Sequence, residues 1–119
     1  MHYLVATDSA RTTVAACEYL QKRVTPDDDV LFLTVVEDDG PDDPTDVLAA
    51  ASDRLTTPTV ETAVRNGTPA DGIRAIVDER EVDELVIRGR RDGGTPGLGG
   101  TASTVLVEAS VPVVVLPSP

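Results

Sequence analysis

The sequence is poor in the residues that most metal, redox and base-stacking sites use. It contains one cysteine, one histidine and no tryptophan, and its aromatic residues are only Tyr3, Tyr19 and Phe32. Cys17 alone excludes an intramolecular disulfide, a CxxC redox pair and a cysteine-based zinc site. His2 alone cannot supply a multi-histidine metal site. Three aromatic residues also make a stacking platform for nucleic-acid bases improbable.

Long apolar runs are absent as well. No stretch approaches 18 consecutive apolar residues, so the sequence has no candidate membrane span. The first residues lack a basic segment followed by an apolar run, so we expect no secretory signal and a cytoplasmic location. The 119 residues match the length of one domain, which we place over residues 1–119.

The balance of charge is strongly acidic. Asp and Glu number 21 against 10 Lys and Arg, which gives a net charge of −11 and a pI near 4.2. Such a surface is repelled by nucleic-acid backbones and anionic membranes, so we expect neither as a partner. Because nine of the ten basic residues are arginine, the composition is typical of proteins from salt-loving archaea, where screening tolerates self-repulsion. The alternative is an acidic protein from an organism that lives at ordinary salt concentration.

Two acidic stretches are expected to be solvated. The first is the turn formed by Asp27, Asp28 and Asp29, and the second is the segment 37–46, with its prolines and six carboxylates. The second could be interpreted as a cation site, but a loop without fixed geometry is a poor cage for a hard cation.

Five short runs rich in valine, leucine and isoleucine predict strands. They are Tyr3–Thr7, Val30–Val36, Thr59–Arg65, Glu84–Arg88 and Val111–Leu116. The third run alternates with polar residues, whereas short continuous apolar runs are typical of parallel strands covered on both faces. Helical spacing of apolar residues predicts helices between them at about 12–24 and 46–55, a third that starts at Thr68 and has Ile73, Ile76 and Val77 on its apolar face, and a fourth at about 101–109. The third has the clearest start, with Thr68 as N-cap and Pro69 in the first helical position. The alternation predicts an α/β sandwich with five parallel strands.

The segment from Gly89 to Thr104 holds six of the nine glycines. It follows the fourth predicted strand and leads into the fourth predicted helix. Glycines let backbone amides approach a ligand, and a helix start adds unpaired N–H donors. Thr101 adds a hydroxyl, and Arg90 and Arg91 add positive charge, so the segment has the composition of a phosphate-binding loop.

Its position supports a ligand site over a structureless glycine loop. Open α/β sheets bind ligands at the carboxyl ends of their strands, beside the point where the strand order reverses. Gly89 follows one such end, and Asp8 follows another. Asp8 has two roles that do not exclude each other: it can accept a hydrogen bond from a ligand, or it can cap the first helix.

Together these residues resemble the universal stress protein family over essentially the whole chain. The matching segments are Thr7-Asp8-Ser9 after the first strand, Gly67-Thr68-Pro69 before the third helix, Glu84 to Gly89 in the fourth strand and Pro112 to Leu116 in the last. Each segment matches weakly by itself, but all lie in register.

The resemblance implies a three-layer, Rossmann-like sandwich of the adenine nucleotide alpha hydrolase type, with strand order 3-2-1-4-5. It also implies a homodimer joined through the fifth strand, Val111–Leu116. One branch of the family binds ATP. Carried over by position, the adenosine contacts are Ala6, Thr7, Asp8 and Val35. Residues near the ribose and phosphates are Gly89, Arg90, Arg91, Gly100, Thr101 and Ala102.

The glycine segment departs from the ATP-binding pattern G-x2-G-x9-G-[S/T]. Gly89 and Gly100 are eleven positions apart, two fewer than in that pattern, and Asp92 stands where the second glycine belongs. A carboxylate in a phosphate nest repels the ligand unless a metal such as Mg²⁺ intervenes or the side chain turns away. A shorter phosphate chain, as in AMP or ADP, or another anion fits such a variant loop.

Features of an enzyme are missing from the sequence. His2 precedes the first strand, at the end of the sheet opposite to the candidate loop, so no Ser–His–Asp triad is expected. Cys17 lies on the apolar face of a helix and is expected to be buried and inert. With no catalytic residues or metal ligands identified, ATP hydrolysis is expected to be slow at most. The leading hypothesis is a dimeric stress-response protein that binds ATP, ADP or AMP. The alternative is a dimeric interaction module of the same fold that has lost ATP, and a small phosphotransferase or phosphatase ranks third.

Overall fold

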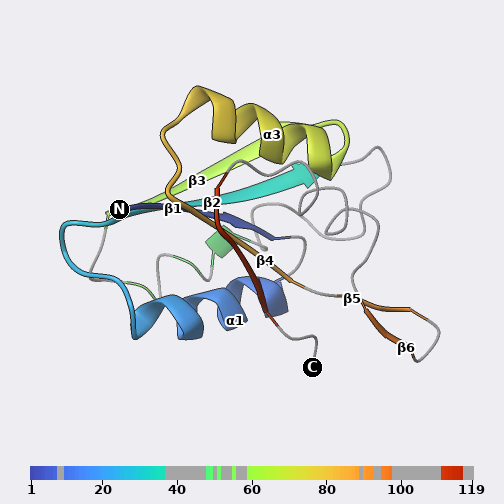
Figure 1. Ribbon diagram of the computed structural model, residues 1–119, viewed down its shortest axis with the longest axis horizontal. Coiled ribbons are helices and arrows are strands. Elements are labelled where there is room, and N and C mark those ends of the chain that lie inside the picture. Colours follow the sequence, from blue (N-terminus) through green and yellow to red (C-terminus); the bar gives the residue numbers. More distant parts are fainter. Residues whose placement is uncertain are drawn as a thin grey trace.

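The computed structural model describes residues 1–7, 10–36, 48–49, 51, 55, 59–88, 90–92, 95–97 and 111–116. Its centre is a five-stranded parallel sheet in the order β3-β2-β1-β4-β7 (Figure 1). The strands are β1 (His2–Ala6), β2 (Asp29–Val36), β3 (Thr59–Asn66), β4 (Glu84–Arg88) and β7 (Val113–Leu116). The expected order 3-2-1-4-5 is confirmed, because β7 is the fifth strand of this sheet. The expected bounds hold to within two residues at every end.

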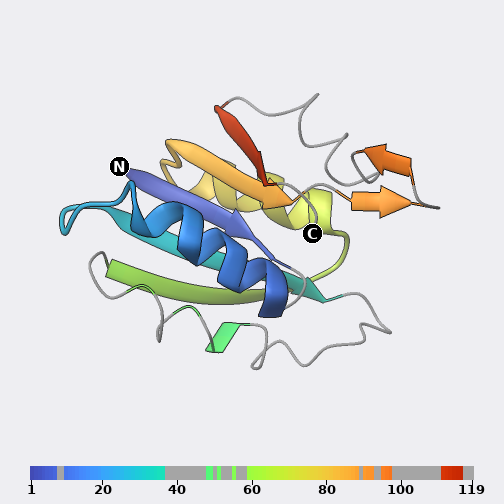
Figure 2. The same ribbon diagram turned by 90° about the horizontal axis from the view of Figure 1, so that it is seen from below.

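Two described helices cover opposite faces of the sheet. Figures 1 and 2 show α1 (Ala10–Gln21) on one face and α3 (Pro69–Glu79) on the other. The N-cap prediction for α3 is confirmed: the Thr68 hydroxyl accepts a hydrogen bond from the Asp71 N–H at 3.4 Å, and Pro69 follows in the first turn. This side-chain acceptor satisfies one of the N–H groups that every helix start leaves unpaired.

The alternation of side chains along each strand builds two cores. Tyr3 and Val5 of β1 join the cluster that contains Ala16, Cys17 and Leu20 of α1. Leu4, between them in the sequence, joins the cluster on the other face, with Ile73 and Ile76 of α3. Because successive strand residues point to opposite faces, a strand apolar at every position is covered on both sides. The continuous apolar runs of the sequence have this cause.

Two ion pairs tie the edge strand β3 to the last turn of α3 and the residue that follows it. The Arg65 guanidinium lies 2.7 Å from a carboxylate oxygen of Glu79, and the Arg80 guanidinium lies 2.7 Å from a carboxylate oxygen of Glu61. All four side chains are substantially exposed. Such surface pairs contribute little to stability individually. Their charges nevertheless lie along one edge of the sheet.

Several expected elements fall wholly or partly outside the described residues. Of the helix expected at 46–55, Leu48, Ala49 and Ala51 are described and have helical geometry. The helix expected at 101–109 and the acidic segment 37–46 lie outside the described ranges. Within those ranges, no helix has the length and apolar content that a membrane crossing requires.

Candidate functional site

The carboxyl ends of β1, β2 and β4 form the edge of the sheet at which the sequence predicts a ligand site. β1 lies between β2 and β4 and runs parallel to both. The chain passes from β1 to β2 on one side and later enters β4 on the other side, so the strand order reverses at β1. Ligand crevices in open α/β sheets lie at such reversal points. Ala6 is in register with Leu33 of β2, so Thr7 and Val35 both lie beyond this pair, toward the carboxyl ends of their strands.

Thr7 is held on three sides by neighbouring residues. Its backbone N–H donates to the carbonyl oxygen of Leu33 at 2.9 Å. Its own carbonyl oxygen accepts from the Thr34 hydroxyl at 2.5 Å, and its hydroxyl lies 2.9 Å from the hydroxyl of Thr13 in α1. The residue is only 5% exposed. Thr7 therefore connects the end of β1 to β2 and α1.

Val35 occupies the end of β2 on the face covered by α3. It is partly buried and packs against the cluster that contains Ile73 and Ile76. Gly72 of α3 approaches it so closely that a Cβ atom on Gly72 would lie 2.6 Å from Val35 Cγ2. The absence of a side chain at Gly72 thus sets how near α3 comes to this corner of the site.

The glycine-rich segment contains a short hairpin that the sequence analysis did not predict. Strands β5 (Arg90–Asp92) and β6 (Thr95–Gly97) pair antiparallel, with Arg90 opposite Gly97 and Asp92 opposite Thr95. Figures 1 and 2 show this hairpin extending beyond the end of β4, away from the sheet.

Only part of the predicted site can be placed. Arg90 and Arg91 belong to the hairpin, where the backbone alone is described. Five predicted contacts lie outside the described residues: Asp8, Gly89, Gly100, Thr101 and Ala102. Their roles, and those of the two arginines, stay predictions.

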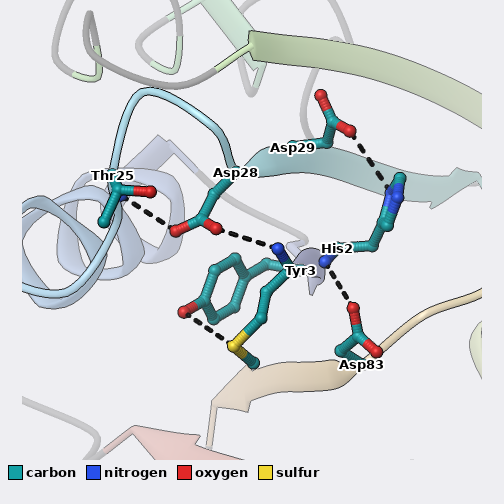
Figure 3. A network of polar contacts seen from close by, with 7 residues as sticks. His2, Tyr3, Thr25, Asp28, Asp29 and Asp83 are labelled. Atoms are coloured by element: carbon teal, nitrogen blue, oxygen red, sulfur yellow. Dashed lines mark hydrogen bonds and ion pairs between the residues drawn. The ribbon is translucent and has the colours of Figure 1, made fainter.

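A second polar network, which no local pattern in the sequence indicates, lies at the opposite, amino end of the sheet (Figure 3). Asp28, expected to be solvated, is only 8% exposed. Its carboxylate accepts from the N-terminal amine of Met1 at 2.9 Å and from the Thr25 N–H at 2.9 Å. The solvation prediction is wrong for Asp28 because these two donors replace water. No local signal marks this aspartate, since the amine is 27 positions away in the sequence.

These contacts shift the titration of both charged partners. The hydrogen bond from the Met1 amine, followed by that from Thr25, lowers the pKa of Asp28. The same bond to Asp28 raises the pKa of the Met1 amine. Burial, followed by the negative charges of Asp28 and Glu84, raises the pKa of Tyr3. Each shift favours the charged state of the Asp28–Met1 pair and the neutral state of the tyrosine.

Glu84 lies beside this network at the start of β4. It is 9% exposed, and Oε1 lies 4.0 Å from the Arg23 guanidinium. Oε2 is buried and has no hydrogen-bond partner within the described part of the chain. The Arg23 guanidinium also lies 5.1 Å from the centre of the Tyr19 ring, which is cation–π range.

The single histidine and cysteine can both be placed. His2 is the first residue of β1 and not a residue before it, and its half-exposed imidazole lies 3.5 Å from the Asp29 carboxylate. It is at the amino end of the sheet, as expected. Cys17 is 1% exposed in the core beneath α1, which confirms that it is buried. In the ranges that the structure describes, no three His, Cys, Asp or Glu side chains gather in a metal-binding arrangement.

Comparison with known proteins establishes the family. Residues 1–117 match the universal stress protein family, so the chain belongs to that family. No curated protein sequence matches the chain significantly.

Solved structures with the same fold include several universal stress proteins. One, described in complex with cAMP, is 20% identical, covers 100% of this chain and 98% of its own, and has a TM-score of 0.74. One from Arabidopsis thaliana with AMP bound is 20% identical. The match covers 100% of this chain and 92% of that protein, with a TM-score of 0.72. One from Archaeoglobus fulgidus in complex with dAMP is 21% identical, with 97% and 96% covered and a TM-score of 0.61. At these identities the similarity establishes the Rossmann-like fold of this chain.

Proposed function

We propose that this universal stress protein binds an adenine nucleotide at the carboxyl ends of β1, β2 and β4. The observation that carries the proposal is the convergence of Ala6, Thr7 and Val35 at the reversal point of the strand order. Relatives of the same fold are described with AMP, cAMP or dAMP. ATP, ADP and AMP, with or without Mg²⁺, are therefore the ligands to test. Their phosphates would lie toward the segment that contains Gly89, Gly100 and Thr101, and any hydrolysis would be slow.

Calorimetric titration with ATP, ADP and AMP, with and without Mg²⁺, tests this proposal. Molar KCl is used because a net charge of −11 disfavours the compact state in dilute buffer. We expect micromolar binding of at least one nucleotide, weakened at least about tenfold, or roughly 1.4 kcal/mol, by Gly100→Asp. Gln21→Glu adds the same charge at the far end of α1 and should leave the affinity unchanged. No heat from any nucleotide, with a folded protein by circular dichroism, refutes the proposal.

The hairpin favours a second candidate, an interaction module that has lost ATP. Pairing of Arg90 with Gly97 and of Asp92 with Thr95 commits backbone groups of the glycine-rich segment to each other. Groups paired in this way are not available to cradle phosphates. The shortened glycine spacing and Asp92 point in the same direction. A folded protein that binds no nucleotide would support this candidate.

We also propose that the protein forms a homodimer through its fifth strand, Val111–Leu116. β7 lies at an edge of the sheet, and its three valines are only partly buried. Sedimentation equilibrium should give the mass of two chains, and Val114→Glu should reduce it to one. Val64→Glu, which places the same charge on the other edge strand at a side chain already 49% exposed, is the control and should remain dimeric. A monomeric wild type contradicts the dimer without touching the nucleotide proposal. The cytoplasmic location and the salt-loving origin stay predictions.

A further inference from the structure

Three buried threonines are linked by hydrogen bonds beside the candidate nucleotide site, at the carboxyl ends of β1 and β2. Thr7, Thr13 and Thr34, which we call the threonine lock, are 5%, 0% and 4% exposed. Burying a hydroxyl costs free energy unless it is hydrogen-bonded, and a valine has a similar shape without a hydroxyl. The hydroxyls of Thr7 and Thr13 lie 2.9 Å apart, and Thr34 donates to the Thr7 carbonyl. Filling the core does not require these hydroxyls. Their contribution is therefore the hydrogen bonds that they form between separate elements of the fold.

The lock joins the three elements that converge on the site. Thr34 belongs to β2, Thr7 follows β1, and Thr13 belongs to α1. The regular pairing of β1 with β2 is described as far as Ala6 and Leu33. The Thr7 N–H and the Thr34 hydroxyl carry that pairing one residue further, since both backbone groups of Thr7 now bond to β2. The contact between Thr7 and Thr13 then attaches the first turn of α1 to the same point.

We propose that the threonine lock positions the adenine nucleotide site, so that Thr7 and Thr34 act by holding the backbone and not by touching the ligand. The inference rests on the proposed nucleotide-binding function. It replaces a direct adenosine contact from the Thr7 side chain, whose hydroxyl is turned into the core toward Thr13. The inference also applies to Val35. The hydrogen bond from the Thr34 hydroxyl to the Thr7 carbonyl fixes Thr34, which immediately precedes Val35 in β2.

The size of the expected effect follows from the energy of one buried hydrogen bond. Such a bond contributes about 0.5–1.5 kcal/mol, which corresponds to a factor of about 2–12 in an equilibrium constant. If the junction must be closed for binding, opening it lowers the fraction of competent protein and raises the apparent Kd by that same factor at most. We therefore expect Thr34→Val to weaken nucleotide binding about two- to tenfold.

The test combines affinity with amide hydrogen exchange of the unliganded protein. Thr34→Val removes the donor and keeps the shape, whereas Thr34→Ser keeps the donor and should restore affinity. Ile76→Val is the structural control: it removes one methylene from the core on the α3 face, at a comparable cost in stability, whereas the contact between Thr7 and Thr13 lies on the α1 face. We expect Thr34→Val to speed exchange at the Thr7 amide and in the first turns of α1, and Ile76→Val to leave both affinity and these amides unchanged.

Each outcome distinguishes a role of the threonine lock in positioning the nucleotide site from a contribution to stability alone. Faster exchange with weaker binding by Thr34→Val, restored by Thr34→Ser, supports the inference. Faster exchange with unchanged affinity overturns it, and so does unchanged exchange at the junction. If Ile76→Val weakens binding equally, general loss of stability explains the effect and the inference falls. If the unaltered protein binds no nucleotide, the proposed function fails, and the exchange result alone decides whether the lock exists.

Discussion

Replacing Gly72 with alanine is the sharpest test of how α3 sits on the sheet. The added Cβ would lie 2.6 Å from Val35 Cγ2, about 1 Å inside the usual carbon–carbon contact distance of roughly 3.5–4 Å. Overpacking of this kind costs about 1–3 kcal/mol. Against it stands a gain of about 1 kcal/mol, because alanine favours a helix interior over glycine. We therefore expect Gly72→Ala to lower the free energy of unfolding by about 1 kcal/mol, the balance of these two effects.

The sign of the effect should reverse when Val35 is shortened. In a Val35→Ala background the clashing methyl is gone, and the new Cβ would lie 3.7 Å from the remaining Cβ of residue 35, an ordinary contact. Only the helix-propensity gain then remains, so Gly72→Ala should stabilise that variant by about 1 kcal/mol. The two substitutions should therefore couple by about 2 kcal/mol, within the range known for residues in contact.

Urea unfolding of the four proteins in molar KCl measures this cycle. A difference of about 1 kcal/mol corresponds to a change of roughly 4 °C in Tm for a chain of this length, so thermal unfolding provides an independent check. A Gly72→Ala protein as stable as the wild type, or additive effects of the two substitutions, would refute the reasoning. Either result would mean that the corner between Val35 and α3 is loosely packed.

Two further predictions concern the turn before α3 and the amino end of the sheet. Gly67 has a φ of +126°, with open space where a Cβ would stand, so Gly67→Ala should cost about 1–3 kcal/mol through backbone strain alone, and equal urea midpoints would contradict this. Since the Met1 amine and Thr25 lower the pKa of Asp28, the stability they provide is present above the ordinary pKa of about 3.9 and is lost as the pH falls through the lowered value. Unfolding free energies measured across this acid range should therefore fall less steeply for Asp28→Asn than for the wild type, and parallel curves would show that Asp28 titrates normally.

The sequence predicts where helices and strands lie along the chain better than it predicts which of them lie side by side in the fold. The bounds of β4 match the prediction, and the N-cap of α3 is the expected Thr68, because both depend on residues adjacent in the chain. The strand order follows from the family resemblance and not from periodicity, since order depends on which strands hydrogen-bond to each other and not on the pattern within any one strand. The first helix begins two residues earlier and ends three residues earlier than its apolar spacing suggests.

The candidate site is less predictable for the same physical reason. The family resemblance proposes Ala6, Thr7 and Val35 as ligand contacts, but nothing near Thr7 in the sequence indicates a bond from Thr34, 27 positions away. The bond between Asp28 and the Met1 amine spans the same separation. The hairpin at 90–97 escapes prediction because glycine-rich segments carry no apolar alternation. Long-range polar contacts form only once the apolar core has brought the strands together.

The two edges of the sheet differ in the charge of the side chains that they carry. β3 carries Glu61 and Arg65, each paired with a charge from α3 or the residue after it, and charged side chains on an edge discourage a further strand from adding there. β7 has the sequence Val-Val-Val-Leu, with no charge along its length. A protein whose sheet can pair with another copy at both edges can add copies without limit and grow into fibres. If only one edge can pair, pairing about a twofold axis occupies that edge on both copies, and assembly stops at two chains.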